Sequence, residues 1–596
     1  MKKLLTKIIC TVLAVVMVFS CTTVAFAGNT VTPVVIVHGL GGSPIYKNPQ
    51  SDSRELLGSF DIGSLFTSNK DAVDLVVDAA YGKLDDPAKL IKAAARIMGD
   101  YAEMGCDKNG NPLPDTGIAN YWTDSLANHT DFLQSETSSE PALCRAICDK
   151  IGAQNAYAFN YDWRIDAYET GEKLDEFIEL VKNQTGKSKV TLIGASEGTD
   201  IISAYIDSHK NDNEVEKVVF LNGAFNGVGV CRLFAMDFVL DKKVIQSYIK
   251  NVTTTMRNKD FDMTRLTWLA DSAGDTIENV CVLFNKIVND PELLKMLYNE
   301  ALYPILGSIP AYWEFIPYNV YDTAVEKTSA IGFLDKSSGL FSKIQRYHGI
   351  QGRLVSNIAE LKNKGVQIAI VANYGLPAVP VTSDCYTQSD ALIETKYASL
   401  GATTANVGKT LPLSKTSKNK YASPDEIIDA STCAFPDNTW FFKGVQHVAY
   451  WYGSQACNFI AELVTTDAPL TISSIKSLTG KTQFIGTDDN LNFAELTTKN
   501  PKTPKISKLK KGSKSFKITV GKVSSISGYQ IQYSTSSKFY KSKTKTVNLS
   551  SKSTSKTIKK LKKNKKYYVR VRTYKVVANK KVYSSWSTVK TVTTKK

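Results

Sequence analysis

Long apolar runs are scarce in this chain of 596 residues. Near the start, three lysines precede an apolar stretch over residues 8–19, and the small-residue pattern Ala25-Phe26-Ala27 follows, which is typical of an export signal. No later segment approaches 18 uninterrupted apolar residues, so an ordinary membrane-spanning helix is not expected there. We therefore predict a signal peptide over residues 1–27 and a secreted, extracellular protein that is soluble or retained at the cell surface.

Cysteine and histidine are also sparse, with ten and five residues respectively. Eight cysteines follow the signal, which permits disulfides in an exported protein but is too few to be needed for the fold. Cys144 and Cys148 lie one helical turn apart, but no His/Cys cluster completes a metal site, so we interpret them as two cysteines on one helix face or as a local bridge. We expect no metal and no organic cofactor.

Acidic residues are absent from the last part of the chain. Residues 499–596 contain 29 Lys and Arg and no Asp or Glu, and because the whole chain carries +16, the remainder carries −13. Few of these basic residues are arginines and few aromatic residues stand among them, which argues against specific nucleic-acid binding. The charge favours retention on an anionic cell-wall polymer or an anionic membrane surface, although non-specific nucleic-acid binding and a lysine-rich surface without a partner are open alternatives.

Residues 28–465 alternate strand-like and helix-like runs. Four runs are typical of buried strands, and they are Val34–Val37, 155–161, Val215–Leu221 and 366–371. A helix is expected over about 168–183. This alternation predicts an α/β domain with a mostly parallel sheet covered by helices on both faces. From about 225 to 365 the strands cease, which predicts a helical cap that either gates the active face or is a plain helical subdomain.

The C-terminal part has a different pattern. Residues 466–500 are rich in Thr, Ser, Asp and Asn and are expected to be a linker. Residues 501–596 contain short strand-like runs at the spacing of an all-β sandwich. The combination of Leu561 with Tyr567, Val569 and Val571 resembles the late strands of fibronectin type III domains, including their corner tyrosine.

The most informative stretch is Gly194-Ala195-Ser196-Glu197-Gly198. A β-branched apolar run over 189–193 precedes it, and apolar residues at helical spacing over 199–206 follow it. Strand, Gly-x-Ser-x-Gly and helix are the context of a nucleophile elbow, in which the serine hydroxyl lies at the positive end of the helix dipole. We therefore predict that Ser196 is a catalytic nucleophile.

An activated serine also needs an oxyanion hole, a base and an acid. The loop His38-Gly39-Leu40-Gly41-Gly42 follows the first strand, and the backbone N–H groups of Leu40 and Glu197 are expected to bind the oxyanion. Among the histidines, His447 follows all the sheet strands, which fits the chain order Ser, acid, His. Between the last strands, Asp390 is the best-placed acid, with Asp384 as the alternative.

These motifs, together with Tyr161-Asp162-Trp163-Arg164 and Pro310-Ala311-Tyr312-Trp313, resemble the lecithin–cholesterol acyltransferase family of α/β-hydrolases over about residues 31–460. The resemblance implies a triad of Ser196, Asp390 and His447, and substrate contacts from Trp163, Tyr312 and Trp313. Asp162-Trp163-Arg164 would shape an acyl pocket or brace the sheet as a structural ion pair. The chain departs from the family pattern in two respects: Ala195 and Glu197 flank the serine, and Ala391 replaces a usual glycine.

Three functions follow as alternatives. The first is a secreted serine esterase or lipase that cleaves acyl esters of lipids through an acyl-enzyme. The second is an O-acyltransferase, in which an alcohol replaces water in the second step. The third is a non-catalytic surface-binding protein whose basic C-terminal domain is the working part. An aqueous extracellular setting favours hydrolysis. The carboxyl group of Glu197 would oppose an oxyanion unless it points away.

Overall fold

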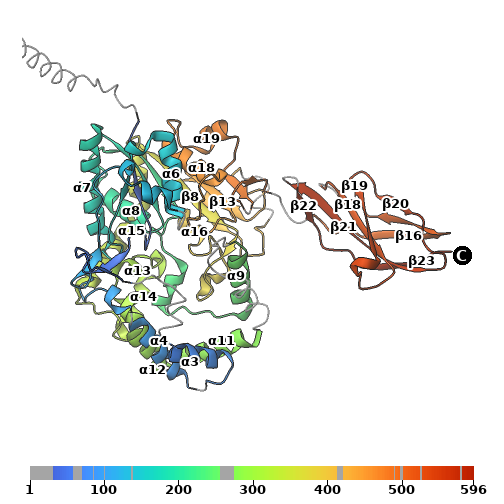
Figure 1. The fold of residues 1–596 in the computed structure, drawn as a ribbon, viewed down its shortest axis with the longest axis horizontal. Helices are drawn as coiled ribbons and strands as arrows, with labels where there is room; N and C mark the ends of the chain where they lie inside the picture. The colour runs from blue at the N-terminus through green and yellow to red at the C-terminus, as the bar shows by residue number, and fades with distance from the viewer. Residues whose placement is uncertain are drawn as a thin grey trace, which may run out of the picture.

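The computed structural model describes most of the chain (Figure 1). The described residues are 31–57, 70–84, 86–99, 101–135, 139–255, 274–412, 420–488, 490–496, 501–523, 526–577 and 580–595. The export signal expected over residues 1–27 lies outside them. Within the described part, no helix combines the length and the apolar character needed to cross a bilayer.

The body of the protein is built on an eight-stranded sheet that is parallel except at one edge. In spatial order its strands are β15 (Phe493–Ala494), β14 (Phe484–Thr487), β13 (Thr439–Lys443), β8 (Gln367–Tyr374), β7 (Val215–Leu221), β6 (Val190–Ala195), β1 (Val34–Val37) and β5 (Ala156–Phe159). Only β15 runs antiparallel to its neighbour. The mostly parallel sheet expected from the sequence is confirmed, and β1 and β7 have the predicted bounds.

Helices cover both faces of this sheet, because successive side chains of a strand point to opposite sides. Val35 and Val37 of β1 join a core with residues of α7 (Ala167–Thr185), α8 (Gly198–His209) and α15 (Gly339–Asn363). Val34 and Ile36 join the opposite core, with residues of α6 (Ser139–Ile151) and α18 (Gln455–Thr465). One run of four apolar residues in β1 therefore serves two cores.

A helical region lies between β7 and β8 in the chain and away from most of the sheet (Figure 1). Its elements are η4 (Gly229–Ala235), α9 (Lys242–Thr255), α11 (Gly274–Asn289), α12 (Pro291–Met296), the π-helix η5 (Leu297–Gly307), α13 (Pro310–Glu314) and α14 (Tyr321–Ala330). The helices α3 (Lys70–Ala80) and α4 (Pro87–Gly99) pack against α11 and η5. The cap expected over 225–365 therefore needs correction, since it includes α3 and α4 and excludes α15, which packs on α8.

The remaining small elements are connections around the sheet. They are the three-stranded sheet β2 (Ile45–Lys47), β3 (Glu55–Leu57) and β4 (Thr116–Ile118), the pairs β9 (Leu376–Pro377) with β10 (Gln388–Ser389) and β11 (Thr403–Thr404) with β12 (Ile428–Asp429), and the helices α5 (Thr130–Gln134), α16 (Thr395–Ala398) and α19 (Ile472–Thr479).

The segment 466–500, expected to be a linker, belongs largely to the body. It contains α19, β14 and β15, and β14 extends the large sheet beside β13. The expectation failed because polar residues dominate the segment, whereas only the apolar pair Phe484 and Ile485 of β14 is needed to bury the strand, one residue in each core. The domain boundary therefore lies after residue 494 rather than at 465.

Residues 506–593 form a two-sheet sandwich of antiparallel strands (Figure 1). One sheet contains β16 (Ile506–Gly512), β17 (Ser515–Val520) and β20 (Ser555–Ile558), and the other contains β18 (Gly528–Ser534), β19 (Thr544–Ser550), β21 (Lys566–Val577), β22 (Lys580–Tyr583) and β23 (Lys590–Thr593). The Tyr567 hydroxyl accepts a hydrogen bond from the backbone N–H of Lys562 at 3.2 Å, as a corner tyrosine does.

Candidate active site

Ser196 lies in the sharp turn between β6 and α8. Its φ of 55° is in the left-handed region, which is unfavourable for a residue with a side chain and marks a constrained position. Gly198 lets α8 begin directly against β1, since a Cβ atom there would lie 2.3 Å from the carbonyl oxygen of Val37. The backbone N–H of Ser196 donates to the Leu221 carbonyl at 3.0 Å, which ties the turn to β7.

His447 and Asp390 converge on Ser196 from two later loops. The hydroxyl oxygen of Ser196 lies 2.9 Å from Nε2 of His447, and Nδ1 of His447 lies 2.7 Å from Oδ2 of Asp390. Oδ1 of Asp390 accepts from the backbone N–H groups of Leu392 at 3.0 Å and Ile393 at 2.7 Å. Because Asp390 is 1% exposed and so held, His447 has a fixed orientation toward Ser196.

The alternative acid, Asp384, lies elsewhere. Its Oδ1 accepts from Nζ of Lys396 at 2.6 Å, and its Oδ2 accepts from the hydroxyl of Tyr397 at 2.8 Å. Both carboxylate oxygens therefore bind groups other than a histidine. Of the two candidate acids, the structure brings only Asp390 to His447.

The loop after β1 packs tightly on the serine turn. A Cβ atom on Gly39 would lie 2.8 Å from Cβ of Ser196, so only glycine allows the approach. Leu40 lines the same pocket as Ser196. Nδ1 of His38 lies 2.8 Å from the Gly39 carbonyl, and Nε2 lies 2.8 Å from the Ser43 hydroxyl. Burial lowers the pKa of His38 to about 4, so the ring is neutral and Nδ1 donates.

Glu197 is buried beneath the serine turn and does not line the pocket. It is 1% exposed, and its Oε2 lies 3.3 Å from the hydroxyl of Tyr161. Burial, reinforced by the nearby Asp200 and Glu314, raises its pKa well above the ordinary value. The raised pKa favours the uncharged carboxyl group, which reduces the expected conflict with an oxyanion.

A pocket of about 300 Å³ opens beside Ser196 and His447. Its lining is mostly apolar, from the glycine-rich loop, the ends of the central strands, Leu143 and Val448. Besides His38, Ser196 and His447, the lining includes one carboxyl group, that of Glu140 in the first turn of α6, whose pKa burial raises to about 7. This arrangement presents an apolar cavity to the serine hydroxyl, which suits an acyl chain.

The three aromatic residues expected to contact substrate do not line this pocket. Trp163 is 5% exposed and contacts Tyr312 edge-on, with ring centroids 6.4 Å apart. Trp313 is 1% exposed, packs against Phe234 and donates from Nε1 to the Gly307 carbonyl at 3.0 Å. All three belong to the hydrophobic packing between the sheet and the helical region, where large aromatic surfaces are most easily buried.

Asp162 and Arg164 form a buried ion pair. Nε of Arg164 donates to Oδ1 of Asp162 at 2.9 Å, and its Nη2 donates to Oδ2 at 2.7 Å. Nη1 donates to the Met104 carbonyl at 3.3 Å and to the Thr116 hydroxyl at 3.0 Å. The pair therefore braces the end of β5 against the segment around β4. This is the structural ion pair that was one of the two expectations for Asp162-Trp163-Arg164.

Two sequence features have no place at Ser196. All eight described cysteines are free thiols, so Cys144 and Cys148 are two residues of one helix rather than a bridge.

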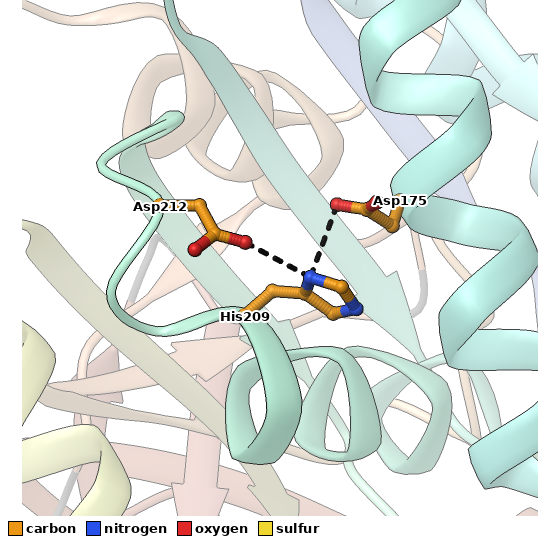
Figure 2. A group of neighbouring side chains, drawn as sticks. All are labelled: Asp175, His209 and Asp212. Atoms are coloured by element: carbon orange, nitrogen blue, oxygen red, sulfur yellow. Dashed lines mark hydrogen bonds and ion pairs between the residues drawn. The ribbon is translucent and has the colours of Figure 1, made fainter.

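Figure 2 shows His209, at the opposite end of α8 from Ser196, between Asp175 and Asp212, with Nδ1 at 3.3 Å and 2.9 Å from their carboxylates. Burial lowers the pKa of His209, but the hydrogen bond to Asp212 and the other carboxylates raise it overall. These contacts favour the charged form of a histidine at the C-terminus of a helix, where the helix dipole also favours positive charge.

Sequence reasoning did not find Tyr161, Ser43 or Glu140 as part of the site. The only available signal was the position of Tyr161 directly before Asp162-Trp163-Arg164. Side chains of this kind become significant only when loops after different strands meet at one edge of the sheet, which no local pattern reveals.

No family model and no curated protein matches this sequence. Solved structures with fibronectin type III domains do match a small part of it. The three FN domains of chicken CNTN1 are 22% identical, cover 17% of this chain and 33% of their own, and have a TM-score of 0.15. The fn3 domain of human contactin 1 is 19% identical over 17% of this chain and 81% of its own, with a TM-score of 0.14. A beta-1,2-glucanase from Parabacteroides distasonis is 20% identical over 17% and 14%, with a TM-score of 0.14.

Proposed function

We propose that this protein is a secreted serine hydrolase of the α/β-hydrolase type that cleaves acyl esters, as an esterase or lipase. The observation that carries the proposal is the continuous chain from Asp390 through His447 to Ser196, with distances of 2.7 Å and 2.9 Å. A serine in a constrained left-handed turn at the start of a helix, beside a glycine-rich loop, supports it.

The proposed reaction has two steps. Nε2 of His447 takes the proton of Ser196 as Oγ attacks the ester carbonyl, and the oxyanion binds the backbone N–H groups of Leu40 and Glu197. The C–O bond of the ester then breaks, and His447 returns the proton to the leaving alcohol. Water, deprotonated by His447, attacks the acyl-enzyme in the same way and releases the acid. Asp390 orients His447 and stabilises its charged form.

A fluorophosphonate probe tests this proposal on the full chain without knowledge of the substrate. We expect covalent labelling of the folded protein, and loss of labelling in Ser196→Ala. Hydrolysis of p-nitrophenyl butyrate should disappear in the same variant. A folded wild-type protein that the probe does not label would instead leave the third alternative, a non-catalytic surface-binding protein.

Acyl transfer uses the same residues, so products must distinguish it. We propose hydrolysis as the main reaction because the extracellular setting expected from the sequence supplies water in large excess over any alcohol. Adding a primary alcohol to the assay should divert little of the product to a new ester. Predominant ester formation at millimolar alcohol would identify an O-acyltransferase.

We also propose that the C-terminal sandwich holds the enzyme on an anionic surface. Residues 499–596 contain 29 basic residues and no acidic residue, and most of the lysines on β16, β17 and β20 are exposed. Attraction of this kind is screened by salt. Retention on anionic vesicles or on an anionic polymer that weakens steeply with added salt would support this role.

A further inference from the structure

The two N–H groups of the candidate oxyanion hole come from two separate loops, which follow two neighbouring strands of the sheet. The N–H of Leu40 belongs to the loop after β1, and the N–H of Glu197 belongs to the turn after β6. These strands are neighbours, but their loops leave the sheet separately. An oxyanion hole requires a fixed distance between its two donors, so something must hold the two loops together.

Tyr161 contacts both loops from the end of the neighbouring strand, β5. Its hydroxyl lies 2.7 Å from the carbonyl oxygen of His38 and 3.3 Å from Oε2 of Glu197. Its ring stacks on the imidazole of His38, with centroids 4.2 Å apart and an interplanar angle of 6°. Tyr161 is 1% exposed, so no water competes for these contacts.

The single proton of the Tyr161 hydroxyl decides the direction of the hydrogen bonds. A carbonyl oxygen can only accept, so the proton of Tyr161 goes to His38. The oxygen of Tyr161 can then only accept from Glu197, which requires a proton on the Glu197 carboxyl group. Oε1 of Glu197 has no hydrogen-bond partner among the described residues, which is tolerable for a neutral acid and very unfavourable for a buried carboxylate.

We infer that a protonated Glu197 donates to Tyr161, which donates to the His38 carbonyl, and that this chain of two hydrogen bonds positions the oxyanion hole. Tyr161 and the side chain of Glu197 are thus positioning residues, and they touch neither substrate nor the reacting atoms. This inference rests on the proposed function. It also explains why the position after the nucleophile carries a carboxyl group that would otherwise oppose catalysis.

The test is the rate at which a fluorophosphonate labels Ser196, because phosphonylation also develops charge on an oxygen in the oxyanion hole. Tyr161→Phe removes the hydroxyl but keeps the ring stacked on His38. We expect kinact to fall about 30-fold, below the 10²–10³-fold cost of losing a donor outright, with KI nearly unchanged. Tyr157→Phe, in the strand β5 that precedes Tyr161, has its ring packed against Phe177 and is the matched control, which should label at the wild-type rate.

Two variants of Glu197 separate a positioning role from simple packing. Glu197→Ala should lose labelling to the same extent as Tyr161→Phe. Glu197→Gln offers an N–H donor of the same shape, so its labelling rate should be at least tenfold higher than that of Glu197→Ala. Circular dichroism and thermal unfolding show whether each variant is folded.

The outcomes distinguish this inference from the proposed function. If the wild type is labelled and folded Tyr161→Phe is labelled within twofold of its rate, the inference is wrong and the proposed function stands. If Glu197→Gln labels as slowly as Glu197→Ala, the neutral-donor chain is wrong. If the wild type itself is not labelled, the proposed function fails.

Discussion

The body and the C-terminal sandwich differ in whether ionisable side chains are buried. The body, with a net charge of −13, buries several ionisable side chains, including the Asp162–Arg164 pair, Glu197 and Asp200. The sandwich, with 29 basic residues in and around it, has a core of apolar and tyrosine side chains such as Phe516, Ile531 and Val571. The lysines of its strands β16, β17 and β20 are exposed.

This difference indicates where each part can act. A buried polar group is costly unless it is paired or neutral, so its presence in the body marks places where the fold holds groups in fixed positions. Exposed lysines are mobile and screened by salt, so they attract a surface without orienting anything. This contrast supports the proposal that the body carries the chemistry and that the sandwich provides attachment, and five predictions test it.

The largest effect is expected at the acid of the body. Asp390→Asn removes the charge that selects the tautomer of His447 and should lower the rate of ester hydrolysis by about 10⁴-fold. Asp384→Asn, the matched control, should change it only a few-fold, because Asp384 binds Lys396 and Tyr397 instead. Measurement of kcat/KM for both variants checks the assignment, and a larger loss in Asp384→Asn would reverse it.

The second prediction concerns the independence of the two parts. Phe516→Ala removes a fully buried ring from the sandwich core and should cost about 3–5 kcal/mol of sandwich stability. Fluorophosphonate labelling of Ser196 should stay at the wild-type rate. Calorimetry should show one thermal transition shifted and the other unchanged, whereas a shift of both would show that the parts unfold together.

The third prediction uses pH. Because burial lowers the pKa of His38 from 6.5 to about 4, the neutral ring stabilises the folded body above pH 6.5, and this stability is lost as pH falls toward 4. Its contribution is about 3 kcal/mol. Denaturant unfolding should show this pH dependence reduced in His38→Gln. Residues 499–596 contain no His, Asp or Glu, so the sandwich should unfold independently of pH over the same range.

The fourth prediction concerns attachment. A chain that ends at residue 498 should lose at least about tenfold in affinity for anionic vesicles at low salt, equivalent to one or two lysines near the surface at about 1 kcal/mol each. Its hydrolysis of a soluble ester should be unchanged. Equal binding of the shortened and full chains in a sedimentation assay would remove the sandwich from this role.

The smallest effect is expected at Ala391, which follows Asp390 in the chain. Ala391 has a φ of 79°, in the left-handed region that favours glycine. Ala391→Gly should therefore stabilise the body by about 1 kcal/mol, as measured by denaturant unfolding, with little change in activity. A loss of stability would show that the alanine side chain contributes more packing than its backbone costs.

Local patterns in the sequence predicted much of the body. The β-branched runs at β1 and β7 and the helix at α7 lie at or near the predicted residues, because apolar period and helix boundaries are local properties. The linker over 466–500 was wrong, because a strand of four residues such as β14 depends on its neighbour β13 more than on its own composition. The sequence also did not predict that α3 and α4 belong to the helical region, because this depends on their packing against α11 and η5, which are distant in the chain.

The candidate site also has a part that the sequence predicted and a part that it did not. Ser196, Asp390 and His447 were chosen by motif and chain order, and the structure brings the three together within hydrogen-bond distance. The pocket lining was not predictable, and Trp163, Tyr312 and Trp313 contact other aromatic residues instead. Which side chains share a cavity depends on how the helical region packs on the sheet.

By itself, the sequence determined the alternation of strands and helices, the serine turn and the separation of a basic, acid-free C-terminal part, because each follows from residues close together in the chain. Only the tertiary structure decided between Asp390 and Asp384, the burial of Glu197 and the role of Tyr161. These depend on loops from strands far apart in sequence that meet at one edge of the sheet. Burial at this edge removes water from around Glu197, and the loss of water raises the pKa of its carboxyl group.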